Sequence, residues 1–274
     1  MANTPYVDEH LSCPKCAAAG RLFFTSDPPV LRSVVCGACG YELPVYDGIA
    51  NFAEHIELAD PELSPAQKVM NSRLFAFFYE TRVWRRLFTP LGSGISMNRE
   101  VREILEMGIK GSEGVVADLA CGTGHYARAF ARRLPKAPVY GLDISPGMLQ
   151  QGFKIANEEG LDNITFLRGD IYRLPFPDSS VQNVNCGGAL HLFSDVKPIW
   201  GEIARVLKPG GVFTAMTIAR SKGTVRKLQV KTEERGRASF FVPEELCSDL
   251  SASGLSSFNC VRHGLCLLFS TIRM

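Results

Sequence analysis

The sequence has no apolar run long enough to cross a membrane. Its 274 residues are 46% hydrophobic, which is enough for a sizeable core, but no stretch approaches the roughly 18 apolar residues of a spanning helix. The amino-terminal residues also lack the basic and apolar regions of a secretory signal and the Arg- and Ser-rich character of a transit peptide. We therefore expect a cytoplasmic protein with no membrane partner, in which a main domain carries a smaller appendage.

Positive charge is scarce in the first 60 residues, which hold three Lys or Arg against eight Asp or Glu, although the whole chain has a formal net charge of +2. Such an acidic segment is a poor partner for a phosphate backbone, so we do not expect a nucleic-acid partner. Basic residues gather instead at 220–240, with seven Lys or Arg against two Asp or Glu. Because this segment is polar and contains Gly223 and Gly236, we expect a mobile loop or lid there.

Four of the nine cysteines have the spacing of a zinc site. Cys13, Cys16, Cys36 and Cys39 form C-x2-C-x19-C-x2-C, in which each C-x2-C pair can present two sulfurs to one metal ion. Disulfides are not expected in a cytoplasmic chain, and a thioredoxin-type redox pair needs a βαβ context. The pattern predicts a zinc ribbon over residues 1–57, with Zn²⁺ supplying much of its folding energy. The strands expected in it are 21–24, 33–35 and 41–46.

Aromatic residues crowd the next segment, 58–111, which we expect to be a helical cap or linker. Apolar residues between 63 and 88 recur at helical spacings, so they either pack a helix onto the main domain or line an apolar substrate cavity. Under the second interpretation the substrate-binding residues are Phe75, Phe78, Tyr79 and Trp84. Arg85 and Arg86 follow Arg82 by three and four residues, about one helical turn. These three side chains either hold an anionic group or form a solvated face.

Residues 115–130 contain the most informative pattern. An apolar run ends in Asp118, a turn of small residues follows at 120–124, and an amphipathic helical pattern begins. This predicts the strand, glycine turn and helix of a nucleotide-binding βα unit. Gly122 and Gly124 lack a Cβ, so the backbone can turn sharply and a ligand can lie against it. A second apolar run ends in Asp143, whose carboxylate can hold a ribose diol.

Two details distinguish between ligands for this unit. Dinucleotide-binding turns usually close with a third glycine, where this chain has Ala127. Asp118 would repel a pyrophosphate held at the helix amino terminus. The acid instead suits a ligand with a cationic amino-acid end.

Strand and helix patterns alternate from residue 115 onward. This alternation predicts a doubly wound, mostly parallel, Rossmann-like α/β sheet over residues 112–274.

The stretch Asp118-x-Ala-Cys-Gly-Thr-Gly resembles the first motif of class I S-adenosylmethionine (SAM)-dependent methyltransferases, whose cofactor carries an ammonium and a sulfonium. Residues 166–171 resemble a later motif, in which the family's acid, here Asp170, contacts the adenine amino group. Residues 205–213 resemble the family's turn into the fifth strand. Because the family's last strand is antiparallel, the resemblance also implies a closing hairpin joined at His263 and Gly264. The resemblance implies SAM contacts from Asp118, Ala120, Cys121, Gly122, Gly124, Asp143, Ile144, Met148, Asp170, Ile171 and Cys186.

The amino-terminal ribbon narrows the resemblance to a branch of this family. The order of zinc ribbon, aromatic helical segment and methyltransferase fold resembles a branch that includes chloroplast-type plant proteins and bacterial small-molecule methyltransferases. Residues 174–181 and 188–191 are similar to that branch and to quinone-biosynthesis methyltransferases. Ribosomal RNA guanine methyltransferases are more distantly similar, but their fourth zinc ligand is commonly a His after a longer gap, and here it is Cys39. The chain also has Gln182 and Asn183 where relatives often have Phe and Asp, which weakens a hydrogen bond near the fourth strand.

His191 is the candidate catalytic and substrate-binding histidine. It follows the fourth strand of the expected sheet, at the carboxyl edge where open α/β sheets bind ligands. A base is needed only if the acceptor must lose a proton during methyl transfer. The alternative is a structural histidine that fixes its loop by hydrogen bonds. His125, in the glycine turn, is expected to pack beside SAM.

Three functions are consistent with this organisation. The first is methyl transfer from SAM to a small aromatic or polyketide-like acceptor, indicated by the aromatic segment. The second is methylation of a ribosomal or transfer RNA base, indicated by the zinc ribbon and the basic segment. The third is a non-methylating role as a cyclase or activator, in which the ribbon would be the docking surface for a protein partner. Fold alone does not identify the acceptor.

Overall fold

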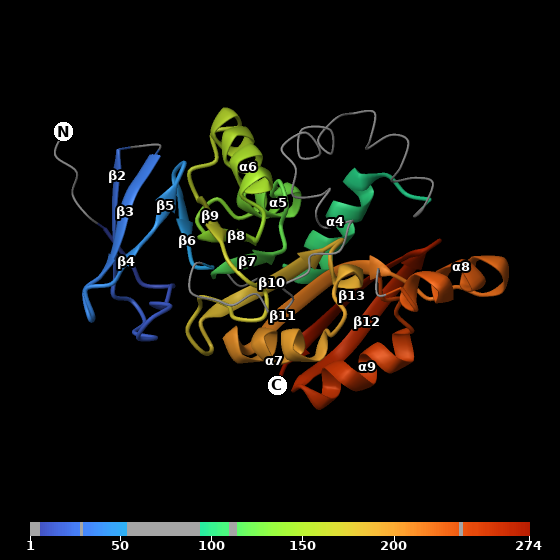
Figure 1. Ribbon diagram of the computed structural model, residues 1–274. Helices are drawn as coiled ribbons and strands as arrows, with labels where there is room; N and C mark the ends of the chain where they lie inside the picture. Colours follow the sequence, from blue (N-terminus) through green and yellow to red (C-terminus); the bar gives the residue numbers. More distant parts are fainter. Residues whose placement is uncertain (1–5, 28–29, 54–93, 110–113, 236–237) are drawn as a thin grey trace.

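Two β-sheets and the helices that flank the larger sheet form the described part of the chain (Figure 1). This computed structural model describes residues 6–27, 30–53, 94–109, 114–235 and 238–274. The predicted domain boundaries after residues 57 and 111 lie outside these ranges and stay predictions.

The amino-terminal sheet has four antiparallel strands in the order β1–β2–β3–β4. Their bounds are Tyr6–Asp8, Leu22–Asp27, Val30–Cys36 and Glu42–Leu43. The strands expected at 21–24 and 33–35 are confirmed by β2 and β3. The single strand expected at 41–46 is wrong, because it divides at Pro44 into β4 and β5 (Val45–Tyr46). Proline has no backbone N–H with which to continue a ladder.

The larger sheet has nine strands in the order β12-β13-β11-β10-β7-β8-β9-β6-β5. Its remaining strands are β6 (Ile49–Asn51), β7 (Val116–Leu119), β8 (Val139–Asp143), β9 (Ile164–Arg168), β10 (Val181–Gly187), β11 (Leu207–Ile218), β12 (Leu255–His263) and β13 (Cys266–Arg273). Strands β6 to β11 pair in parallel, and β12 and β13 form an antiparallel hairpin on β11. This topology confirms the predicted parallel sheet and its closing hairpin.

Helices cover both faces of the larger sheet, as expected for a doubly wound fold (Figure 1). The α-helices are α4 (Met97–Gly108), α5 (His125–Arg133), α6 (Pro146–Glu158), α7 (Lys197–Val206), α8 (Gly223–Glu233) and α9 (Pro243–Ala252), with a short 3₁₀ helix η1 (Leu190–Leu192). In Figure 1, α4, α5 and α6 lie above the sheet and α7 and α9 lie below it. Within the described ranges, none of the helices combines the length and apolar character that crossing a bilayer requires.

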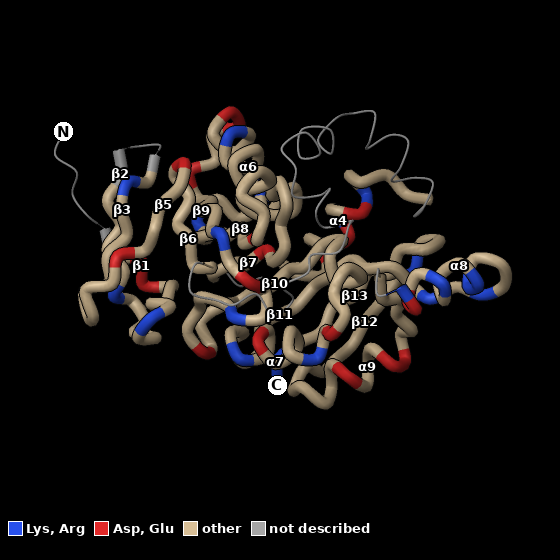
Figure 2. Tube along the Cα trace, in the orientation of Figure 1, with Lys and Arg blue, Asp and Glu red and all other residues tan. Residues whose placement is uncertain are grey.

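The basic segment is not the loop predicted from its polarity. Residues 223–233 form α8, which extends at the margin of the molecule with its Lys and Arg residues along it (Figure 2). Gln229 anchors the helix, because its buried side chain accepts from the Ser221 N–H (2.7 Å) and donates to the Ala219 carbonyl (3.0 Å). A helix can carry charges on its outer face while a single inward side chain holds it in place.

One hydrophobic core joins the two sheets. Leu11, Phe24 and Val34 of the amino-terminal segment belong to the same buried cluster as Tyr140 and Leu142 of β8. The Tyr140 hydroxyl also donates to the buried Asp8 carboxylate, with O···O distances of 2.9 and 3.0 Å. The four-stranded sheet is therefore packed directly on the strand that ends in Asp143.

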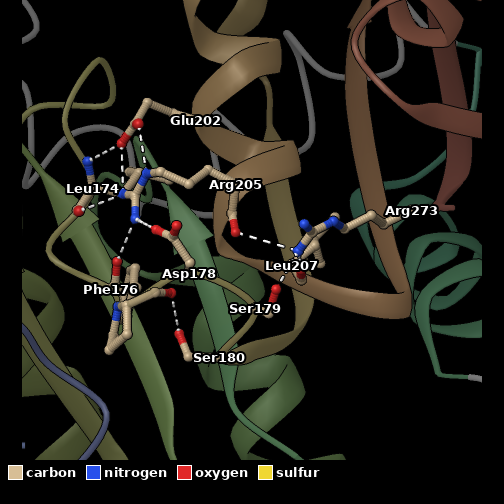
Figure 3. Close-up of polar contacts among 10 residues, drawn as sticks. Leu174, Phe176, Asp178, Ser179, Ser180, Glu202, Arg205, Leu207 and Arg273 are labelled. Carbon is tan, nitrogen blue, oxygen red and sulfur yellow. Dashed lines mark hydrogen bonds and ion pairs between the residues drawn. The ribbon is translucent and has the colours of Figure 1, made fainter. Parts of the chain in front are cut away.

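A network around Arg205 fixes the loop that leads into β10 (Figure 3). The Arg205 guanidinium donates to the carboxylates of Glu202 and Asp178 at 2.8 Å. It also donates to the carbonyls of Phe176 (2.8 Å) and Leu174 (3.1 Å). Charge-assisted and forked guanidinium bonds are among the stronger polar contacts. They hold the start of β10 against α7, while the other end of β10 lies at the site described next.

Candidate functional site

The candidate site lies where the parallel strands β7, β8 and β10 end. Strand β7 is central, and its Asp118 pairs in register with Asn185 of β10 and Gly141 of β8. The carboxyl ends of these strands share one edge of the sheet, which is where open α/β sheets bind ligands. The turn between β7 and α5 crosses this edge.

The turn at 120–124 has the left-handed backbone that its glycines allow. The φ angles are +49° at Ala120, +56° at Gly122 and +72° at Gly124, a region in which residues with a Cβ are strained. At Gly124 an added Cβ would lie 2.6 Å from the Phe166 ring, so packing also requires glycine there. At Gly122 an added Cβ would meet nothing within 4 Å. The turn therefore presents open space beside Gly122.

Asp118 is completely buried and holds three elements together. Its Oδ1 accepts from the Asn185 side-chain amide (2.7 Å), and its Oδ2 accepts from the Ala127 N–H in α5 (2.9 Å). Burial, with a smaller contribution from the negative charge of Asp143, raises the pKa of Asp118 to about 7. Both oxygens therefore accept hydrogen bonds within the protein, and a direct contact between Asp118 and a cationic ligand stays a prediction.

Asp143 ties the end of β8 to the glycine turn. Its Oδ2 accepts from the Gly122 N–H (2.7 Å), and its Oδ1 accepts from the Ser145 N–H at the start of α6 (2.8 Å). Burial raises the pKa of the Asp143 carboxyl. The carboxylate lies beside the turn, as a ribose-binding acid should.

The other predicted cofactor residues lie along the neighbouring strand ends and loops. Asp170 and Ile171 follow β9, and the Asp170 carboxylate accepts from the Tyr172 N–H (3.0 Å). Met148 is buried in the first turn of α6, and Ile144 lies directly after β8. Cys121 in the turn and Cys186 in β10 have thiol pKa values raised by burial, so neither is a ready thiolate at neutral pH.

His191 lies in η1, directly after β10, and its loop is held through the main chain. The His191 carbonyl accepts from the Ser239 N–H (2.7 Å), and the Ser239 hydroxyl donates to the Phe193 carbonyl (3.0 Å). Its ring Nδ1 is buried and has no hydrogen-bond partner among the described residues. Burial lowers the pKa of His191 to about 4, so the ring is neutral at pH 7. These contacts give no support to the alternative in which the ring itself fixes the loop.

The predicted metal ligands converge. The Sγ atoms of Cys13, Cys16, Cys36 and Cys39 all lie within 4.8 Å of one another. Two of the distances, Cys13 to Cys39 and Cys16 to Cys36, are 3.8 Å. A tetrahedral site with Zn–S bonds of about 2.3 Å has edges of about 3.8 Å. The four sulfurs therefore fit one zinc ion.

The proposed substrate-binding aromatics lie outside the described residues. They are Phe75, Phe78, Tyr79 and Trp84, and the same applies to Arg82, Arg85 and Arg86. Their predicted roles are retained as predictions. Asn183 lies in β10, and its buried side-chain amide nitrogen has no partner in the described structure.

Glu100 of α4 is a buried acid that the sequence analysis did not identify. Its Oε1 accepts a hydrogen bond from the Tyr126 hydroxyl, and its Oε2 is buried without a partner in the described structure. Burial raises the pKa of the Glu100 carboxyl. Helical periodicity was an available signal, because Glu100 shares the inner face of α4 with Ile104 and Gly108.

Comparison with known proteins identifies the domain type. Residues 116–211 match the family described as "Methyltransferase domain". Two uncharacterized chloroplastic methyltransferases of Arabidopsis thaliana are similar: At2g41040 is 35% identical over 191 residues, and At1g78140 is 30% identical over 243 residues. The alignments cover 68% and 85% of this chain and 54% and 66% of the relatives, so the chain spans less than two thirds of their length.

Two further comparisons support the domain type and its fold. A demethylmenaquinone methyltransferase of Geobacillus kaustophilus is 40% identical over 96 residues, covering 35% of this chain and 41% of that protein. The structure of a phosphoethanolamine N-methyltransferase of Haemonchus contortus in complex with SAM superposes with a TM-score of 0.60 at 15% identity. That superposition covers 74% of this chain and 57% of the other. At such identity the structural likeness shows the fold alone.

Proposed function

Since the chain carries a class I SAM-dependent methyltransferase domain, we propose that it transfers the methyl group of SAM to a small aromatic or polyketide-like acceptor. The observation that supports this proposal best is the turn at 120–124. There the Asp143 carboxylate accepts a hydrogen bond from the Gly122 N–H, and open space lies beside Gly122. The aromatic segment at 58–111 and the demethylmenaquinone methyltransferase relative favour an aromatic acceptor.

The residues at this edge fit SAM chemically. The carboxylate of Asp143 suits the ribose diol, and Asp170 suits the adenine amino group that the corresponding acid contacts in the family. The backbone at Gly122 can approach the ligand closely, because no side chain intervenes. When bound, SAM supplies an electrophilic methyl group on a positively charged sulfur.

The protein's part in the reaction is alignment and, for some acceptors, proton removal. The acceptor atom must reach the methyl group in line, at about 3–3.5 Å, in a site that excludes water. His191 follows β10 at the same edge and is neutral at pH 7, so it can accept the proton of a phenol or acidic carbon as the new bond to the methyl group forms. The carbon–sulfur bond breaks in the same step, and its electron pair neutralises the sulfur.

Replacing His191 with alanine should lower turnover by about 100-fold or more, because a positioned general base contributes about that much. The affinity for S-adenosylhomocysteine should change by less than about threefold, since the loop is held through main-chain bonds. Turnover is measured as S-adenosylhomocysteine release over a panel of phenols, quinols and aromatic polyketides, and affinity by calorimetry. Equal losses of turnover and affinity would assign His191 a structural role.

The same assay separates the proposed function from the alternatives. Under a non-methylating role, no acceptor would increase S-adenosylhomocysteine release. Under an RNA methyltransferase role, release would depend on RNA, and RNA binding would weaken with salt.

We further propose that Zn²⁺ occupies the Cys13, Cys16, Cys36 and Cys39 site as a structural ion. Four cysteine ligands close a tetrahedral site and leave no position for a reacting water. A protein partner that docks on the ribbon and a cytoplasmic location stay predictions. The two Arabidopsis relatives are named as chloroplastic proteins.

A further inference from the structure

We propose that Glu100 binds the ammonium group of SAM, an inference that rests on the proposed function. The sequence motif predicts Asp118 for this role, and each Asp118 oxygen already accepts a hydrogen bond, from Asn185 or Ala127. Glu100 has a buried carboxylate oxygen to which no described residue donates.

Glu100 lies at the same edge of the sheet as the candidate site. Its partner Tyr126 belongs to the first turn of α5, directly after the Gly122 to Gly124 turn. The Tyr126 ring packs against Gly187, the last residue of β10, so closely that a Cβ at position 187 would overlap the ring. The contacts therefore run from the end of β10 through Tyr126 to the Glu100 carboxylate.

An unpartnered carboxylate oxygen in a protein interior needs an explanation. Burying a polar or charged group without a hydrogen bond is costly, and such groups are normally paired. Two basic side chains near Glu100 are already engaged, because the Arg99 guanidinium (2.8 Å) and a ring nitrogen of His263 (2.7 Å) both bind Glu103. A ligand that brings its own cation to this edge would complete the pairing, and an ammonium group offers up to three N–H donors.

Tyr126 positions the Glu100 carboxylate. Its hydroxyl donates to Glu100 Oε1, which orients the carboxylate and leaves Oε2 for the ligand. Glycine at 187 is what allows the ring to lie there, because any larger residue would displace it. Together these residues would make the site select ligands with a free amino group.

The test compares two ligands that differ only beyond the sulfur. S-adenosylhomocysteine carries the amino acid with its ammonium, and 5′-methylthioadenosine keeps the nucleoside and thioether without it. In Glu100→Gln the affinity for S-adenosylhomocysteine should fall by about 10- to 100-fold, the range expected for losing a charge-assisted hydrogen bond. The affinity for methylthioadenosine should stay within about threefold. Calorimetry on the full chain gives both values.

Glu103→Gln is the matched control, because it removes a carboxylate one turn away on α4 that is already paired with Arg99 and His263. Both affinities should be unchanged in this variant. For each variant we take the affinity for S-adenosylhomocysteine divided by the affinity for methylthioadenosine, because this ratio corrects for any general loss of folded protein. Tyr126→Phe should lower this ratio, as Glu100→Gln does. If Glu100→Gln keeps the wild-type ratio, the assignment is wrong. If the wild-type protein binds neither ligand, the proposed function itself fails.

Discussion

Removing the metal ion from the four-cysteine site should lower the melting temperature of the whole chain by about 10 °C or more. Structural zinc sites contribute several kcal/mol or more of folding free energy, and in a domain of this size each kcal/mol corresponds to about 2–4 °C. The effect should extend beyond the ribbon, because Cys13 and Cys36 belong to the same buried cluster as Tyr140 and Leu142 of β8.

Loss of the metal ion should also weaken SAM binding. Strand β8 ends in Asp143 and carries Tyr140, whose hydroxyl binds Asp8 of the amino-terminal sheet. The measurement is a thermal melt and a SAM titration before and after chelation, with released metal quantified by mass spectrometry. Cys39→Ser should reproduce the change, and Cys247→Ser, outside the cluster, should not. Stoichiometric metal release with an unchanged melting temperature would contradict the structural role.

Replacing Gly122 with alanine should reduce SAM affinity by about tenfold or more at a small cost in stability. Gly122 has φ +56°, so an alanine there is strained by about 1 kcal/mol. The new methyl group meets no protein atom within 4 Å. The methyl group would instead enter the space beside residue 122 in which we expect SAM to bind.

Gly210→Ala is the matched control for this change. Gly210 has φ +77°, and its added Cβ likewise meets nothing within 4 Å, but it lies near the amino end of β11, between the paired residues Leu207 and Val212. Both variants should lose about the same free energy of unfolding in urea, and only the Gly122 variant should lose SAM affinity. Equal SAM affinities in the two variants would place the cofactor elsewhere.

The fold was largely predictable because its signals are local. Alternating strand and helix patterns from residue 115 and the glycine turn each follow from short-range backbone preferences, and the structure confirms them. The cysteine spacing likewise predicted a cluster that the structure brings together. The helix α8 was missed because its charges resemble a loop, whereas a single buried Gln229 fixes it.

The site was predictable only in part, because several of its features depend on contacts distant in sequence. Residues 120–124 and Asp143 were found from motif spacing, but the bond between Gly122 and Asp143 spans 21 residues. The pairing of Glu100 with Tyr126 spans 26 residues and joins two helices. No local pattern reports that one oxygen of Glu100 is left without a donor.

We expect the edge formed by β7, β8 and β10 to bind SAM. Isothermal calorimetry of zinc-loaded protein with SAM tests it most directly, at pH 8, above the pKa of about 7 of Asp118, so that this carboxylate is charged. We expect saturable binding at one site per chain, and weaker binding in Gly122→Ala. Folded, metal-loaded protein that gives no binding heat with SAM or S-adenosylhomocysteine at several temperatures would contradict it.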